Sequence, residues 1–115
     1  MEMFEIAKAL GAIAHESRLA IFRLLVQAGP AGLAAGKIAE LTTLAPSSLS
    51  FHLKELALAD MVSSRQEGRF VIYSARYETM NSVLAYLTEN CCGGNPCTPV
   101  TDCCPPTKRK ATVKA

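Results

Sequence analysis

The sequence predicts one mainly α-helical domain with a β-hairpin (α+β, about five helices), followed by a short cysteine-rich tail. Three observations lead to this prediction. Apolar residues recur at helical spacing over most of the first ninety residues or so, the period changes to that of strands near residue 61, and the last stretch shifts to Cys, Gly, Pro and Thr. With 115 residues and 50% hydrophobic side chains the chain can form one core, so disorder throughout is not expected.

Apolar spacing predicts the first two helices. One runs from Phe4 to Ile13, and the next begins near His15, where Glu16 suits the positive end of the helix dipole. Gly29 and Pro30 in AGPAG end the second helix. Its predicted apolar stripe comprises Leu19, Ile21, Phe22, Leu25 and Val26.

The third and fourth helices are separated by the turn LAPSS. GKIAELTT forms the third helix, with Ile38, Ala39 and Leu41 directed inward. Pro46 discourages helix at Ala45, so Pro46 or Ser47 opens the fourth helix, SSLSFHLKELALA. The apolar side of this helix comprises Leu49, Leu53, Leu56 and Ala57, and another side comprises Ser48, Phe51, His52 and Glu55.

Two short β-type runs follow, MVSSR and RFVIYSA, and they flank QEG with Gly68 in the turn of a hairpin. Helical spacing then returns in YETMNSVLAYLTEN, carried by Met80, Val83, Leu84 and Leu87. We expect residues 1–90 to form the folded domain. Residues 91–115 are expected to form a flexible, cysteine-rich C-terminal tail without a core of its own.

Two helices joined by a tight turn and followed by a hairpin are the plan of a winged helix-turn-helix, which binds double-stranded DNA. The fourth helix would read base edges, Lys54 would contact phosphate, and the hairpin arginines would contact the backbone or the minor groove. Each residue also has a structural explanation: serines cap helices, a histidine packs in the core, and arginines are solvated. The candidate DNA-binding residues are Ser47, Ser48, Ser50, His52, Lys54, Arg65 and Arg69.

These residues, taken together, also match the pattern of a known family. From LGAIAHESRLAIFRLL to about Leu87, and above all in LSFHLKEL and RQEGRFVIYS, the chain closely resembles the ArsR/SmtB family of metal- and metalloid-responsive bacterial repressors. The resemblance implies a homodimer formed by the first and last helices, which binds operator DNA when empty and releases it with inducer. Many arsenic sensors of this family have cysteines where ELTTLAPSS stands, and zinc sensors have histidines on the last helix. Both ligand sets are missing here.

All five cysteines lie in the tail. Gly93, Gly94 and Pro96 let the chain turn back, so the three thiols of Cys91, Cys92 and Cys97 can converge on one soft ion. As(III) or Sb(III) takes three sulfurs, and the cluster resembles the C-terminal site of one arsenic-sensing subgroup. We therefore expect As(III) or Sb(III) as the inducer, with no organic cofactor.

Several alternatives stay open for the tail. Cys103 and Cys104 could complete a four-thiolate zinc or cadmium site, bind a methylated arsenical as a pair, or be spare. A reversible disulfide would make the protein an oxidant sensor. Catalysis is not expected, because the C-x5-R spacing of Cys103 and Arg109 contains two prolines, which lack the amide hydrogens that an oxyanion loop needs.

Composition adds the remaining expectations. The formal net charge is only +2, so DNA binding requires the basic side chains to gather on one face. We find no export signal and no apolar stretch long enough for a membrane span, and so expect a cytoplasmic protein with no membrane partner. Reducing conditions there argue against a permanent disulfide framework in the tail.

Overall fold

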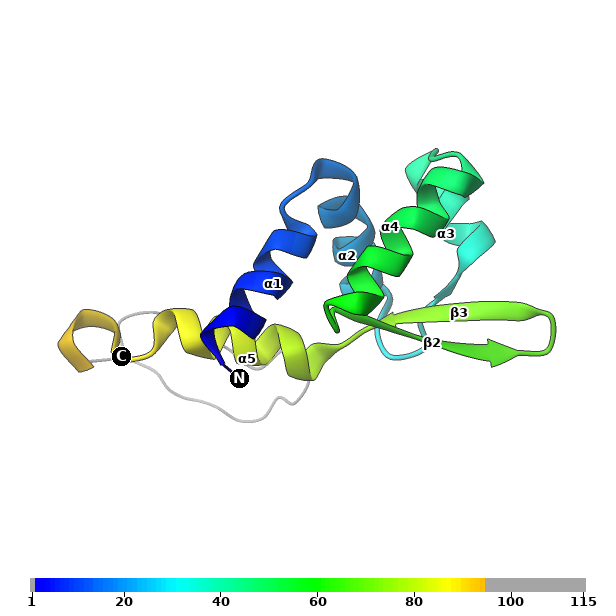
Figure 1. Cartoon of the computed structure of the whole chain (residues 1–115). Helices are drawn as coiled ribbons and strands as arrows, with labels where there is room; N and C mark the ends of the chain where they lie inside the picture. The colour runs from blue at the N-terminus through cyan, green and yellow to red at the C-terminus, as the bar shows by residue number, and fades with distance from the viewer. Residues whose placement is uncertain (1, 95–115) are drawn as a thin grey trace. The chain divides into compact units, whose positions relative to one another are not determined.

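The computed structural model of the chain describes residues 2–94 (Figure 1). Residues up to Val83 form one compact unit, and Leu84 begins a second. The predicted five helices and hairpin are confirmed. In chain order the elements are α1 (Met3–Ile13), α2 (Glu16–Ala28), β1 (Leu33–Ala34), α3 (Ala35–Thr42), α4 (Pro46–Leu58), β2 (Val62–Glu67), β3 (Phe70–Ala75), α5 (Tyr77–Thr88) and the 3₁₀ helix η1 (Cys91–Gly94).

Local hydrogen bonds explain where the helices begin. The backbone N–H of Glu2 donates to Oε1 of Glu5 at 2.8 Å, which forms half of a capping box at α1. His15 caps α2, because its Nδ1 accepts from the backbone N–H of Ser17 at 3.1 Å. Pro46 occupies the first turn of α4, where its missing N–H costs no helical hydrogen bond.

The sheet has three strands in the order β1-β3-β2. The hairpin pairs antiparallel from Val62 opposite Ala75 to Glu67 opposite Phe70, and in Figure 1 it extends away from the helices as a wing. The short strand β1, which periodicity did not predict, places Leu33 opposite Tyr73. Gly32 leads into β1 with φ of +73°, and a Cβ there would run into the Tyr73 carbonyl oxygen.

The core lies where α2, α3 and α4 meet the base of the hairpin. Its largest fully buried side chains are Ile21, Leu25, Ile38, Leu53, Leu56 and Met61. Three predicted inward residues are exposed instead, namely Leu19, Leu41 and Ala57. At about 100° per residue, Leu19 lies opposite Ile21, and Ala57 lies beyond the edge of the stripe formed by Leu49, Leu53 and Leu56.

The sequence predicted no segment that spans a membrane. Within residues 2–94, no helix combines the length and the apolar character that crossing a membrane requires.

Candidate nucleic-acid interface

Helix α4 presents a polar face to solvent. Ser47, Ser48, Ser50 and Lys54 are exposed, whereas Leu49, Leu53 and Leu56 are buried on the opposite side. The serines do not cap the helix, because its N-cap residue is Ala45, which makes no side-chain cap bond. None of the three hydroxyls bonds to another described residue, so all are available to a ligand. This is the surface that a reading helix needs in a major groove.

His52 has a structural partner that the sequence did not reveal. Arg18, on α2, donates from Nε to Nδ1 of His52 at 3.1 Å. The His52 ring also lies beside the ring of His15, with centroids 4.9 Å apart and planes tilted by 47°. His52 is half-buried, so the structure fixes the orientation of this ring rather than leaving it to rotate in solvent.

Arg18 also lies over an aromatic ring. Its Cζ is 5.5 Å from the centroid of Phe51, whose side chain is 53% exposed. A cation–π contact of this kind restrains a guanidinium that would otherwise be mobile. The contacts of Arg18 with Phe51 and His52 connect the N-terminal half of α2 to the middle of α4.

The surroundings of His52 lower its pKa below the ordinary value of 6.5. Burial is the main cause, because it disfavours the charged ring, and the electrostatic interactions with His15 and Arg18 act in the same direction. His52 is therefore neutral at neutral pH. This agrees with the hydrogen bond, since a protonated ring has no lone pair at Nδ1 to accept from Arg18.

The two wing arginines differ. Arg65 donates from Nε to Glu67 Oε2 at 2.6 Å, from Nη1 to Ser74 Oγ at 3.2 Å, and from Nη2 to the Ala31 carbonyl at 2.8 Å. Arg69 is exposed beside the turn at Gly68 and bonds to no described residue. Arg65 thus ties the wing to the loop before β1, whereas the charge of Arg69 is available to phosphate.

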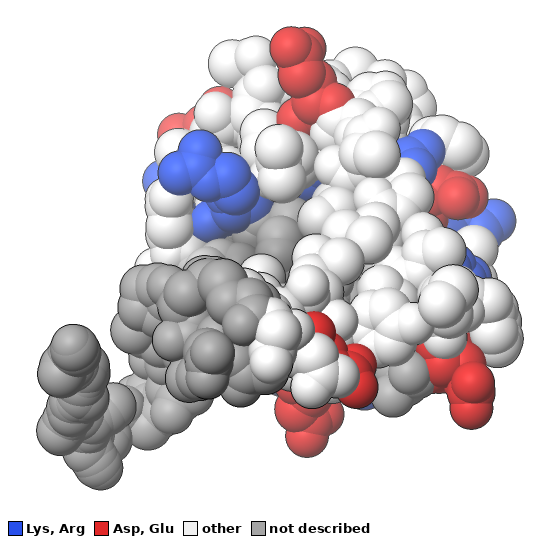
Figure 2. Space-filling model, turned by 90° about the vertical axis from the view of Figure 1, so that its left-hand side faces the viewer, with Lys and Arg blue, Asp and Glu red and all other residues white. Residues whose placement is uncertain are grey.

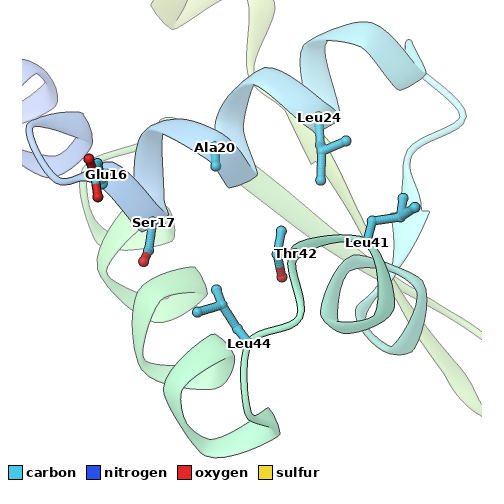
Figure 3. Close-up of a pocket in the computed structure, with 7 residues that line it drawn as sticks. All are labelled: Glu16, Ser17, Ala20, Leu24, Leu41, Thr42 and Leu44. Atoms are coloured by element: carbon cyan, nitrogen blue, oxygen red, sulfur yellow. The ribbon is translucent and has the colours of Figure 1, made fainter.

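A groove of about 500 Å³ lies beside the helix-turn-helix (Figure 3). Figure 3 shows Ala20 and Leu24 of α2 on one side, with Thr42 and Leu44 from the end of α3 and the following turn on the other. No thiol or imidazole lines it, and Glu16 is its one carboxylate. The groove therefore lacks the donor set of a metal or metalloid site.

Of the predicted sensor site, Cys97 lies outside the described residues, as do the alternative ligands Cys103 and Cys104. Cys91 and Cys92 lie in η1, shortly after α5 ends at Thr88, and Cys91 is half-buried. Within residues 2–94, no three His, Cys, Asp or Glu side chains are grouped as they would be around a metal ion. The site at Cys91, Cys92 and Cys97 stays a prediction.

Comparisons with known proteins agree with this geometry. A family model described as a helix-turn-helix domain matches residues 13–65. The chain is 32% identical over 78 residues to YceK of Bacillus subtilis, an uncharacterized HTH-type transcriptional regulator, covering 68% of this chain and 77% of YceK.

Solved structures of three proteins are also similar. An ArsR-like transcriptional regulator from Rhodococcus sp. RHA1 matches with a TM-score of 0.64 and 26% identity over 72% of this chain and 76% of its own. A possible transcriptional regulator for arsenical resistance gives 0.62 and 25%, over 70% and 80%. The homodimeric winged helix-turn-helix domain of Mb0332 from Mycobacterium bovis gives 0.63 and 24%, over 75% and 78%, which supports the fold.

The polar face of α4, the helix pair and the wing define a winged helix-turn-helix transcriptional regulator, which is a DNA-binding protein and not an enzyme. Within that class, the chain belongs to the ArsR/SmtB family.

Proposed function

We propose that the chain is an arsenic-responsive repressor. In this proposal a homodimer binds operator DNA when free of metalloid and releases it when As(III) or Sb(III) binds the thiolates of Cys91, Cys92 and Cys97. The observation that carries the proposal is the placement of the cysteines. The rest of this DNA-binding domain has no thiol, and Cys91 and Cys92 lie in η1, shortly after α5 ends at Thr88.

The exposed face of α4 supports operator binding. Ser47, Ser48 and Ser50 offer hydroxyls to base edges, and Lys54 and Arg69 offer charge to phosphates. On the face drawn in Figure 2, Lys and Arg lie in separate groups among Asp and Glu, and the coloured part of that face has no continuous basic area.

Exposed apolar side chains support the dimer. On α1, Met3 is 69% exposed and Phe4 is 70% exposed. On α5, Leu84 and Leu87 are 40% and 57% exposed. Large apolar side chains left in solvent mark interaction surfaces when they cluster, and the similar Mb0332 domain is described as homodimeric. Both helices would then be covered by the partner copy.

The donor set fits As(III) better than zinc. Three thiolates satisfy a trivalent arsenic centre, whereas zinc prefers four ligands and often recruits histidine, and both histidines of this chain lie at the α2–α4 contact. The similarity to a possible regulator for arsenical resistance points the same way. Cys103 and Cys104 keep a cadmium or zinc site as the alternative, and a thiol-redox switch as another.

The position of Cys91 connects the thiols to the dimer. Only Glu89 and Asn90 separate it from the end of α5, and Asn90 has a left-handed φ of 57°. A ligand that draws Cys91, Cys92 and Cys97 together restrains the end of α5. Because we assign α5 to the dimer surface, such a restraint changes the separation of the two reading helices, which must match the half-site spacing.

The direct test is fluorescence anisotropy of the reduced full-length protein on its promoter DNA, titrated separately with As(III), Cd(II) and Zn(II). We expect As(III) to release the native protein. It should not release a variant carrying Cys91→Ser and Cys92→Ser.

A variant carrying Cys103→Ser and Cys104→Ser is the matched control, because it removes the same number of thiols from the same tail. It should still respond to As(III). Release of the protein by Cd(II) or Zn(II) alone would overturn the arsenic assignment in favour of the four-thiolate alternative. If none of the three ions releases the protein, the thiol-redox switch is favoured instead.

A further inference from the structure

We propose that Arg18 is a positioning residue for sequence readout: its Nε–H fixes His52 as an Nε2–H donor directed at a hydrogen-bond acceptor on a DNA base edge. This inference rests on the proposed binding of operator DNA by α4. Arg18 lies on α2, outside the reading helix, and was not among the residues predicted to serve DNA binding.

The first step concerns the proton on His52. A guanidinium has five N–H donors and no acceptor, so Arg18 can only donate. Since Arg18 Nε lies 3.1 Å from His52 Nδ1, that ring nitrogen must accept with its lone pair. A neutral imidazole has one N–H, so the proton of His52 is on Nε2.

The second step concerns rigidity. Arg18 is held by the Phe51 ring 5.5 Å from its Cζ, and the His52 ring lies against His15 at 4.9 Å and edge-on to Phe51 at 5.8 Å. His15 is itself fixed, because its Nδ1 caps α2 through the N–H of Ser17. The residues around His52 therefore restrain both the tautomer and the ring plane before any DNA binds.

The third step concerns the ligand. His52 Nε2 has no partner among residues 2–94, and its neighbours Ser48 and Lys54 on α4 are exposed. An N–H donor pairs with guanine O6 or N7, adenine N7 or thymine O4, and does not pair with the amino group of cytosine N4. A His52 without Arg18 could carry its proton on either nitrogen, so it could accept from cytosine as well. Arg18 thus limits His52 to base edges that accept a hydrogen bond.

The competing explanation is that Arg18 binds phosphate, because its Nη groups bond to no described residue. A phosphate contact contributes equally to all sequences, whereas a positioning residue changes the preference at one base pair. The two explanations therefore predict different results from the same variants.

The experiment selects binding sites from a random duplex library with the full-length, metalloid-free, reduced protein and with four variants. Arg18→Gln and Arg18→Lys remove the Nε donor, and the latter keeps the charge. His52→Gln keeps a donor near the Nε2 position. Arg23→Gln is the matched control, because it removes one exposed arginine from the same helix, α2. Nitrogen-15 shifts of the histidine rings in the DNA-free proteins report the tautomer directly.

In the native protein we expect His52 Nδ1 to be unprotonated, and both Arg18 variants to show a mixture of tautomers. Both should relax the preference at one base pair roughly threefold to tenfold, the range for losing one hydrogen bond. His52→Gln should retain that preference in part, and Arg23→Gln should retain it fully.

An unchanged preference in both Arg18 variants, with affinity reduced for every sequence, overturns the inference and leaves Arg18 as a phosphate contact. Protonated Nδ1 in the native protein overturns it as well. If the native protein selects no sequence, the proposed operator binding itself fails, which is a distinct result. Thermal unfolding of each variant shows whether it is folded.

Discussion

The guanidinium of Arg65 on the wing donates from Nη2 to the backbone carbonyl of Ala31, 2.8 Å away and 34 positions earlier in the chain. The same side chain bonds Ser74 on the neighbouring strand and Glu67 on its own. Ser74 in turn donates to the carbonyl of Pro30 at 3.3 Å. The loop between α2 and β1 is therefore joined to the base of the wing by side chains as well as by strand pairing.

Arg65→Ala should lower the free energy of unfolding by about 1 kcal/mol, because a half-exposed hydrogen-bonded fork is lost and the carbonyl of Ala31 returns to water. Urea unfolding measures this. Arg65→Lys should recover little, since an ammonium cannot reproduce three directed bonds. Equal stability of Arg65→Ala and native protein would show that these contacts do not hold the wing.

Arg69→Ala should leave stability unchanged and weaken binding to all DNA sequences alike. Its exposed guanidinium bonds to no described residue, so a phosphate is its expected partner. The slope of log affinity against log salt concentration should fall by about 1. Arg23→Ala, an exposed arginine on α2, is the control and should keep the native slope.

The fold contains features that the sequence could predict and features that it could not. Periodicity predicted five helices and the hairpin, because local spacing determines which residues of one element can be buried together. The contacts of Arg18 with His52 and of Arg65 with Ala31 both span 34 residues, and no local pattern encodes such pairs. Strand β1 has two residues, too few for any alternation to be visible.

The exposed serines of α4 illustrate the same distinction. Their exposure followed from the buried spacing of Leu49, Leu53 and Leu56, so the face of α4 was predictable. The turn of the His52 ring toward α2 was not, because it depends on how two helices cross. Arg65 and Arg69 look alike in sequence, and their different surroundings appear only when β1, β2 and β3 are aligned.

Acid should destabilise the protein through His52. Because its pKa is lowered in the folded state, the unfolded chain binds more protons, and stability must fall as pH drops below the unfolded value of about 6.5. Urea unfolding at about pH 7.5 and about pH 5.5 measures the loss. His52→Gln should lose less stability over this interval. An identical loss in that variant would assign the acid sensitivity to other groups.

Gly32→Ala should be strongly destabilising, by more than about 1 kcal/mol. The position combines a left-handed φ of +73° with a close approach to the carbonyl of Tyr73. Gly29→Ala is the control for conformation alone, because φ there is +84° but nothing lies within 4 Å of the added Cβ. Gly36→Ala, inside α3, should stabilise slightly. If Gly29→Ala and Gly32→Ala lower the free energy of unfolding equally, the contact with Tyr73 contributes nothing to the destabilisation by Gly32→Ala.

Operator DNA and As(III) should each weaken binding of the other by the same factor. If ligation at Cys91, Cys92 and Cys97 favours the dimer geometry that does not fit the operator, then bound operator must disfavour ligation equally, since the coupling free energy belongs to the pair of sites. Couplings of this kind are typically about 1–3 kcal/mol, which is roughly 5- to 150-fold in affinity. Calorimetric titration of As(III) into free and DNA-bound protein measures how DNA changes the affinity for As(III). DNA titration with and without As(III) measures how As(III) changes the affinity for DNA. Equal As(III) affinity of free and DNA-bound protein would mean that the tail thiols bind metalloid without controlling the reading helices.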